Sequence, residues 1–154
     1  MRSDCDVVCL NRVTGSSPIQ AHTLNVGARR PLGLGAGGLA ILMALPGAEA
    51  EAVIATNGQR HLAWERLSAQ RLRELVALSR RTGYVINDED LMPGVGAIGI
   101  AFETRHASSA SGMPALAAIS IAAIATRMRG NRRKEPAREL AAELKLLTRR
   151  INRG

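Results

Sequence analysis

Residues 29–40 decide the expected fold, and they read Arg29-Arg30-Pro31-Leu32-Gly33-Leu34-Gly35-Ala36-Gly37-Gly38-Leu39-Ala40. This segment passes directly into residues 39–45, which are apolar on every side and predict a buried helix that ends at Pro46-Gly47. Glycines ahead of a buried helix let a ligand approach the backbone, and the helix start favours an anion such as a carboxylate. The same glycines also suit tight packing of the helix on a sheet, and local sequence favours neither interpretation.

The glycine segment also matches the spacing of a dinucleotide-binding motif, G-x-G-x-x-G, at residues 33–38. That motif requires a hydrophobic strand immediately before it, whereas residues 27–31 intervene here. Glu49 and Glu51, near the required acidic position, lie at a predicted helix start, and no Lys-Ser/Thr pair completes a P-loop. We therefore predict no dinucleotide or other cofactor.

The composition indicates one globular domain with an aliphatic core. Of 154 residues, 46% are hydrophobic but only 2% are aromatic, and a domain of this size buries roughly 70% of its unfolded surface. No run of 18 apolar residues is present and no apolar signal segment follows Met1, so we predict a cytoplasmic protein without a membrane span. Cys5 and Cys9 are too far apart along a strand for a disulfide and are expected to be free thiols.

The net charge of +8 is concentrated at the C-terminal end. Residues 1–126 contain 11 Lys or Arg and 10 Asp or Glu, whereas residues 127–154 contain 10 and 3, a net charge of +7. Such a tail can contact phosphate or an acidic partner. We favour a solvated loop followed by a helix with a charged outer face, because no aromatic residues interleave the arginines to stack on bases.

Hydrophobic spacing and turn residues predict two strands, three helices, three short strands and a last helix. The expected strands are 5–13, 18–26, 84–86, 94–102 and 113–123, and the expected helices are 39–45, 48–56, 69–81 and 136–151. A four-residue hairpin connection joins the first two strands, and a basic loop spans 127–136. Strands joined by hairpins, with helices grouped between them, indicate an α+β fold with an antiparallel sheet.

In two of these helices the sequence predicts the ends or the buried face. Ser68 and Gly83 are expected to cap the third helix. Its predicted buried face comprises Leu72, Leu75, Val76 and Leu78, and the predicted stripe of the last helix comprises Leu140, Leu144, Leu147 and Ile151.

Catalytic and metal-binding patterns are weak. His22, His61 and His106 are scattered, without the spacing of a metal site, and no nucleophile elbow is present. The run Asn87-Asp88-Glu89-Asp90 could host acid/base chemistry, but a polar run before Pro93-Gly94 is more typical of a solvated turn. We predict no enzyme, no catalytic residue and no bound metal.

Three collinear strings resemble the effector-binding domain of IclR-type transcriptional regulators. They are Cys9-Leu10-Asn11-Arg12-Val13-x-Gly15-Ser16-x-Pro18-Ile19-Gln20 with Val26-Gly27-x-Arg29-Arg30-Pro31-Leu32-Gly33, then Arg81-Thr82-Gly83-Tyr84-Val85-Ile86-Asn87-Asp88-Glu89 with Pro93-Gly94-Val95-Gly96-Ala97-Ile98-Gly99, and Pro114-Ala115-Leu116-Ala117-Ala118-Ile119-Ser120-Ile121-Ala122 with Arg127. Together they cover the chain from about Cys5 to Ile151.

The resemblance implies a GAF-like α+β fold, in which helices flank an antiparallel sheet with a ligand pocket on one side. It implies that residues 1–154 form one effector-binding domain that starts at an interior strand and lacks the opening strand of the sheet. It also implies a homo-oligomer whose DNA contacts belong to a winged helix-turn-helix outside this chain.

The family's pocket positions fall on six residues here: Gly35 and Ala36 at the helix start, then Asn87, Ala97, Ser120 and Ala122. In acid-binding members Asp is common at the position of Asn87, Cys can occur at Ala97, and a second Ser can occur at Ala122. The resemblance therefore implies a less polar pocket here, for a small organic acid or an aromatic or apolar metabolite. Loop 104–112 looks longer than usual and is expected either to cover the site or to be disordered.

Three functions follow from these observations. The first is an effector sensor for a transcriptional regulator. The second is an oligomerisation module with a vestigial pocket, and the third is a nucleic-acid binder acting through the basic C-terminal segment.

Overall fold

The fold was analysed in a computed structural model, which describes residues 1–16, 24–61, 63, 67–104 and 115–151. The elements in chain order are β1 (Arg2–Ser3), β2 (Asp6–Val8), β3 (Arg29–Pro31), α1 (Gly35–Ala44), α2 (Gly47–His61), α3 (Ala69–Thr82), β4 (Val85–Asp88), β5 (Val95–Thr104), β6 (Ala115–Ile124), α4 (Ala125–Met128), the 3-10 helix η1 (Gly130–Arg133) and α5 (Lys134–Ile151).

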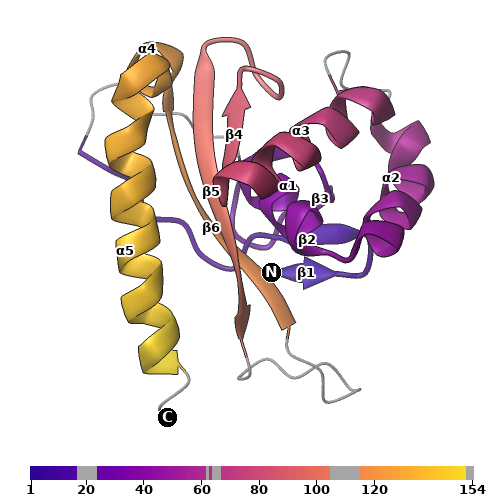
Figure 1. Cartoon of the computed structure of the whole chain (residues 1–154), viewed down its shortest axis with the longest axis horizontal. Coiled ribbons are helices and arrows are strands. Elements are labelled where there is room, and N and C mark those ends of the chain that lie inside the picture. The colour runs from indigo at the N-terminus through magenta and orange to yellow at the C-terminus, as the bar shows by residue number, and fades with distance from the viewer. Residues whose placement is uncertain (17–23, 62, 64–66, 105–114, 152–154) are drawn as a thin grey trace.

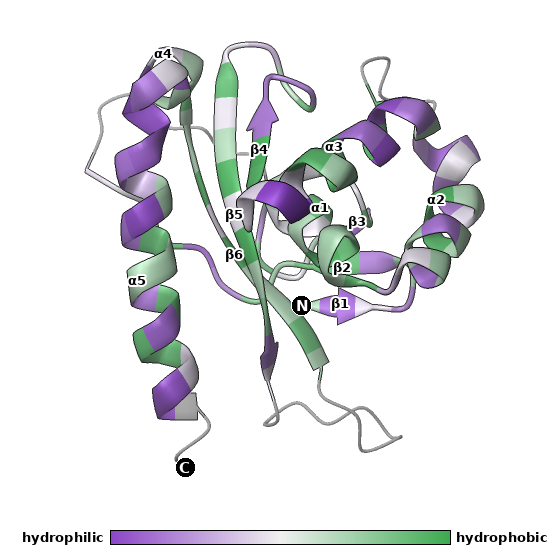
Figure 2. Ribbon diagram, viewed as in Figure 1, coloured by the Kyte–Doolittle hydropathy of each residue, from purple (hydrophilic) through white to green (hydrophobic). Residues whose placement is uncertain are grey.

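The strands form two antiparallel sheets of three strands each, in the orders β1-β2-β3 and β4-β5-β6. The sheet β4-β5-β6 has the longer strands and is called the larger sheet. It lies between α5 on one side and α1, α3 and the smaller sheet on the other (Figure 1). Figure 2 shows hydrophobic residues along α1 and the long strands, and hydrophilic residues on the outer surfaces of α3 and α5. The predicted α+β class with antiparallel strands flanked by helices is confirmed.

The predicted first hairpin is wrong. Strand β2 ends at Val8 and pairs with β3, so Val7 lies opposite Arg30, and residues 24–26 of the predicted second strand are not in a strand. Its residues 18–23 lie outside the described ranges. Leu10 and Val13 are 58% and 87% exposed, so the expected strand has no buried face beyond β2. The unpredicted β1 pairs with the other side of β2.

Helix α1 is the centre of the core, as the apolar run predicts. It starts at Gly35, earlier than expected, and Leu39, Ala40, Ile41 and Leu42 are fully buried within it. Its backbone meets strand β5 at Gly99, where an added Cβ would lie 2.4 Å from the carbonyl oxygen of Ala36. Only a residue without a side chain allows this approach.

Helix α2 extends past its predicted end. Asn57 and Gly58 were expected to stop it, but Asn57 is fully buried and its Nδ2 donates a hydrogen bond of 2.7 Å to the carbonyl of Cys5. A polar side chain with a buried partner stabilises the helix that carries it, so the helix continues to His61.

Both predicted caps of α3 are confirmed. The Ser68 hydroxyl accepts a hydrogen bond from the Arg71 amide, and Gly83 ends the helix at φ +78°. The predicted face is right for Leu72, Leu75 and Val76, which are buried, but wrong for Leu78, which is 44% exposed.

The far side of the larger sheet is covered by the C-terminal elements. The basic loop predicted at 127–136 is wrong, because α4 and η1 occupy it and α5 begins at Lys134, with Pro136 in its first turn. Leu140 and Leu144 of α5 are buried as predicted, whereas Leu147 is 36% exposed. Ile151 ends α5, and its side chain lies outside the described set. No helix in the described ranges is long and apolar enough to cross a membrane.

Candidate functional site

The first component of the candidate site is the start of α1. Gly35, Ala36 and Gly37 form its first turn, where backbone N–H groups have no partner within the helix. The residue before the helix, Leu34, provides no side-chain cap. This end of α1 can therefore donate hydrogen bonds to an acceptor, and the helix dipole favours a negatively charged one.

The second component is a row of three residues across the larger sheet. Asn87 on β4 lies opposite Ala97 on β5, and Ala97 lies opposite Ala122 on β6. Paired residues of an antiparallel sheet point to the same face, so all three side chains share one surface.

Helix α1 covers the same surface. The neighbouring row contains Gly99 and Ser120. Gly99 lies under Ala36, and a Cβ added to Gly37 would be 3.6 Å from the Ser120 hydroxyl oxygen. All six residues predicted for the pocket therefore lie at the start of α1 or on the face of the sheet that α1 covers. Their role in binding stays a prediction.

Asn87 has an unsatisfied buried donor. Its side chain is only 3% exposed, and its Nδ2 has no hydrogen-bond partner among the described residues. Leaving a buried amide unpaired costs about 1–3 kcal/mol, so native structures rarely keep such a group without a reason. A ligand that accepts a hydrogen bond would satisfy it.

The surroundings of Asn87 are apolar. Ala97 is half-buried against the core around α1, and Ala122 is exposed beyond it. Leu91 lies beside the start of α1, because its Cδ2 would be 3.4 Å from a Cβ added to Gly35. None of the six predicted residues is charged, so an anion would be held by amide groups and the helix dipole.

The run 87–90, predicted as a solvated turn, is one only in part: Asn87 and Asp88 end strand β4, Glu89 and Asp90 follow in a bend, and the three carboxylates are ion-paired. Asp88 pairs with Arg133 at 3.7 Å, Glu89 pairs with Arg129, and Asp90 pairs with Arg71 at 3.5 Å. We therefore name residues 88–90 the acidic turn. Carboxylates occupied in this way are poor candidates for acid/base catalysis.

The site contains three residues that sequence analysis did not assign to it: Gly37, Leu91 and Gly99. The signal for Gly99 was present, because a Gly- and Ala-rich strand indicates close packing against a neighbour. No sequence pattern identified Leu91, whose position depends on how the β4–β5 connection folds back towards α1.

The remaining titratable residues that the structure describes form no second reactive centre. His61 is the last residue of α2, and its Nε2 lies 3.0 Å from the carbonyl oxygen of Leu32. Within the described residues, no group of three or more His, Cys, Asp or Glu is placed to hold a metal ion. His22 and His106 lie outside the described ranges, as does most of loop 104–112.

Comparisons with known proteins agree with the α+β fold. The sequence matches the family described as bacterial transcriptional regulator IclR C-terminal over residues 1–152. No protein of curated function matches it.

Several solved structures share the fold, among them the following three. The repressor BlcR of Agobacterium tumefaciens has a TM-score of 0.75 and 23% identity, over 97% of this chain and 56% of that one. The IclR protein of Thermotoga maritima has a TM-score of 0.73 and 20% identity, over 99% and 57%. An IclR-family transcriptional regulator of Brucella abortus has a TM-score of 0.69 and 15% identity, over 99% and 53%. The chain thus spans just over half the length of each.

Proposed function

Because the chain belongs to the IclR C-terminal family of bacterial transcriptional regulators, we propose that it senses a small organic effector where α1 meets the larger sheet. The first turn of α1 and the row Asn87-Ala97-Ala122 are the two walls of this proposed effector site. The observation that carries the proposal is the buried Nδ2 of Asn87, which has no hydrogen-bond partner among the described residues and lies on the face that α1 covers.

The donors and the apolar wall together define the class of ligand. Asn87 Nδ2 and the first-turn amides of α1 all donate, so the ligand must accept through a carboxylate or carbonyl oxygen. The methyl groups of Ala97 and Ala122 and the side chain of Leu91 favour an apolar body behind that acceptor. We therefore propose a small organic acid or carbonyl compound with an aliphatic or aromatic portion.

The proposal extends to the whole regulator. The domain, residues 1–154, would control DNA binding by a winged helix-turn-helix located outside this sequence, and it would act as a homo-oligomer in the cytoplasm. It would have no catalytic activity of its own, which fits the repressor and regulators that share its fold.

A thermal-shift screen of small carboxylates and aromatic metabolites tests the proposed effector site. A ligand present at 100 times its Kd stabilises the folded state by about 2.7 kcal/mol, so a true effector raises the melting temperature measurably. In Asn87→Leu the buried amide donor is removed, and in Gly35→Trp the helix start is filled. Both variants should lose the shift.

The control variant is Gln59→Ala, an exposed amide on α2, which should keep the full shift. Far-ultraviolet circular dichroism checks that Asn87→Leu and Gly35→Trp remain folded. A shift that survives unchanged in both folded variants would refute the assignment of the site.

A further inference from the structure

A cavity lies on the side of strand β4 that faces away from the proposed effector site. It is an open groove of about 360 Å³, lined by the C-terminal turn of α3, strand β4 with Tyr84 before it, η1 and the first residue of α5. Ile86 of β4 and Tyr84, which directly precedes the strand, line the cavity; they alternate with Val85 and Asn87 and so face the other way. We call this cavity the β4 groove.

The volume of the β4 groove falls in the range of small-molecule sites, which is about 300–1,000 Å³. Its apolar wall includes Leu78, the residue of α3 that sequence analysis placed wrongly in the core. Leu78 is 44% exposed, and Tyr84 and Ile86 beside it are only partly buried. An apolar or aromatic ligand of modest size would cover all three side chains.

The opposite wall of the β4 groove is cationic and polar. It is formed by Asn131, Arg133 and Lys134, where η1 passes into α5. The contact of Arg133 with Asp88 is long, at 3.7 Å, and Lys134 has no ion pair with an acidic side chain in the described part of the chain. The groove therefore keeps an excess of positive charge, which complements an anion.

We propose that the β4 groove is a second ligand site, which binds a small organic anion with an apolar or aromatic body. The body packs against Leu78, Tyr84 and Ile86, and the anionic group meets Lys134, Arg133 and the amide of Asn131. This site is separate from the proposed effector site, because Tyr84 and Ile86 face away from the side of β4 that carries Asn87.

Benzoate is a suitable probe, since it joins one carboxylate to one apolar ring. Titration of the isotopically labelled chain with benzoate, followed by amide NMR, should shift the signals of residues 84–86 and 130–134. Acetate, which lacks the ring, and benzyl alcohol, which lacks the charge, should each bind at least tenfold more weakly.

Two substitutions test the walls. Lys134→Ala should weaken benzoate binding about fivefold or more, and Leu78→Gln should do the same by removing apolar contact. The matched control is Lys145→Ala, which removes an exposed lysine from the same helix but outside the groove. It should leave the affinity unchanged.

Benzoate could also enter the proposed effector site, so the titration is repeated in Asn87→Leu. Shifts in 84–86 and 130–134 that persist there support the β4 groove independently of the effector proposal. Three outcomes would overturn it: no shift in these residues, equal weakening by Lys145→Ala, or shifts that follow protein concentration instead of benzoate. The last would assign the groove to contacts between two copies of the chain.

Discussion

His61 is the residue through which the stability of this fold should respond to pH. It is only 2% exposed, and because the carbonyl of Leu32 can only accept, His61 Nε2 must donate to it. Its Nδ1 is then buried without a partner among the described residues. Burial lowers the pKa of His61 and the charge of Arg60 lowers it further, against the opposing effect of the Leu32 hydrogen bond.

We therefore expect the free energy of unfolding to fall as pH falls below the ordinary histidine value of about 6.5. In that range the unfolded chain binds a proton that folded His61 resists, and the loss continues until the pH reaches the lowered folded-state pKa. The slope for one proton is at most about 1.4 kcal/mol per pH unit.

Urea unfolding at pH 7.5 and pH 5.5 measures this effect in the natural sequence and in His61→Gln. The variant should lose less stability on acidification, since glutamine does not titrate and all other histidines are common to both proteins. Equal losses in the two proteins would show that His61 is not responsible.

At the scale of elements, the contact between α1 and β5 depends on Gly99. A methyl group there would lie 2.4 Å from the Ala36 carbonyl oxygen and 2.7 Å from its carbonyl carbon, which are backbone atoms that cannot turn aside. We expect Gly99→Ala to destabilise the protein by about 3 kcal/mol, the upper part of the usual range for overpacking.

The midpoint of urea unfolding measures the effect of Gly99→Ala, and Gly58→Ala is its control. Gly58 lies inside α2 and an added Cβ would meet nothing within 4 Å, so alanine should stabilise the helix by about 0.5–1 kcal/mol. The packing account fails if both substitutions have effects of the same sign and size.

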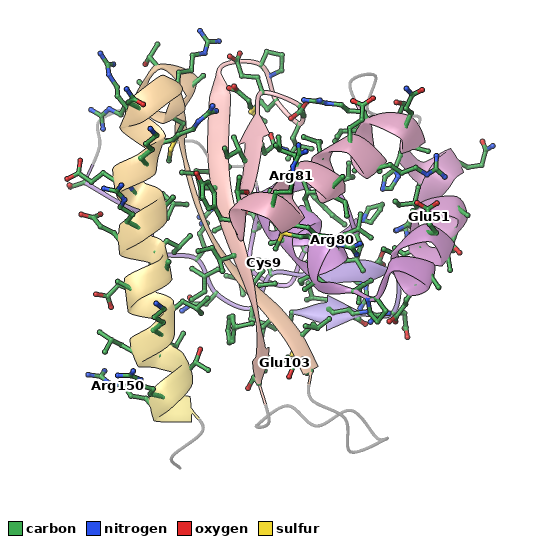
Figure 3. All side chains as sticks on the ribbon, in the orientation of Figure 1. Cys9, Glu51, Arg80, Arg81, Glu103 and Arg150 are labelled. Atoms are coloured by element: carbon green, nitrogen blue, oxygen red, sulfur yellow. The ribbon has the colours of Figure 1, made fainter. Side chains whose placement is uncertain are left out.

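Arg80 joins α3 to the end of α1. Its Nε donates to the carbonyl of Met43 at 3.1 Å and its Nη2 donates to that of Leu45 at 2.7 Å (Figure 3). Arg80→Ala should cost about 1 kcal/mol, because these carbonyls at the helix end lose charged donors but regain some contact with water.

The neighbouring Arg81 provides the control for Arg80→Ala. It is exposed and has no hydrogen bond or ion pair with the described residues, so Arg81→Ala should change the free energy of unfolding by less than about 0.5 kcal/mol. Calorimetric melting of the two variants compares them directly. Equal costs would mean that the bonds to α1 contribute nothing.

Elements with local signals could be predicted from sequence, and those held by distant contacts could not. The apolar run at residues 39–45 predicted α1, and Ser68 and Gly83 predicted the two ends of α3. By contrast, β3 is defined by its pairing with β2. Helix α2 continues past its predicted end through Asn57, whose side chain donates a hydrogen bond to the carbonyl of Cys5. Neither contact has a signature within its own segment.

The candidate site shows the same limit. Composition and spacing identified only the glycine-rich helix start, whereas Asn87, Ala97, Ser120 and Ala122 came from resemblance to a family. Sheet register places these residues on one face, and register depends on pairing between segments far apart in the chain. That Asn87 Nδ2 has no partner in the described part of the chain could be seen only in three dimensions.

For the whole molecule, the acidic turn links the proposed effector site to both layers around it. Asp90 is paired with Arg71 of α3, whereas Asp88 and Glu89 are paired with Arg133 and Arg129 at η1. Asn87 directly precedes this turn, so a ligand bound to Asn87 would contact a segment that is ion-paired to α3 and to η1. The β4 groove lies between the same two elements.

The central claim is that the start of α1 and the row Asn87-Ala97-Ala122 hold the effector. The most direct test is a crystal structure of the chain with the carboxylate that stabilises it most. Our account predicts a ligand oxygen within about 2.7–3.2 Å of Asn87 Nδ2, with a second contact to a first-turn amide of α1. A ligand bound elsewhere, with Asn87 Nδ2 still unpaired, would contradict it.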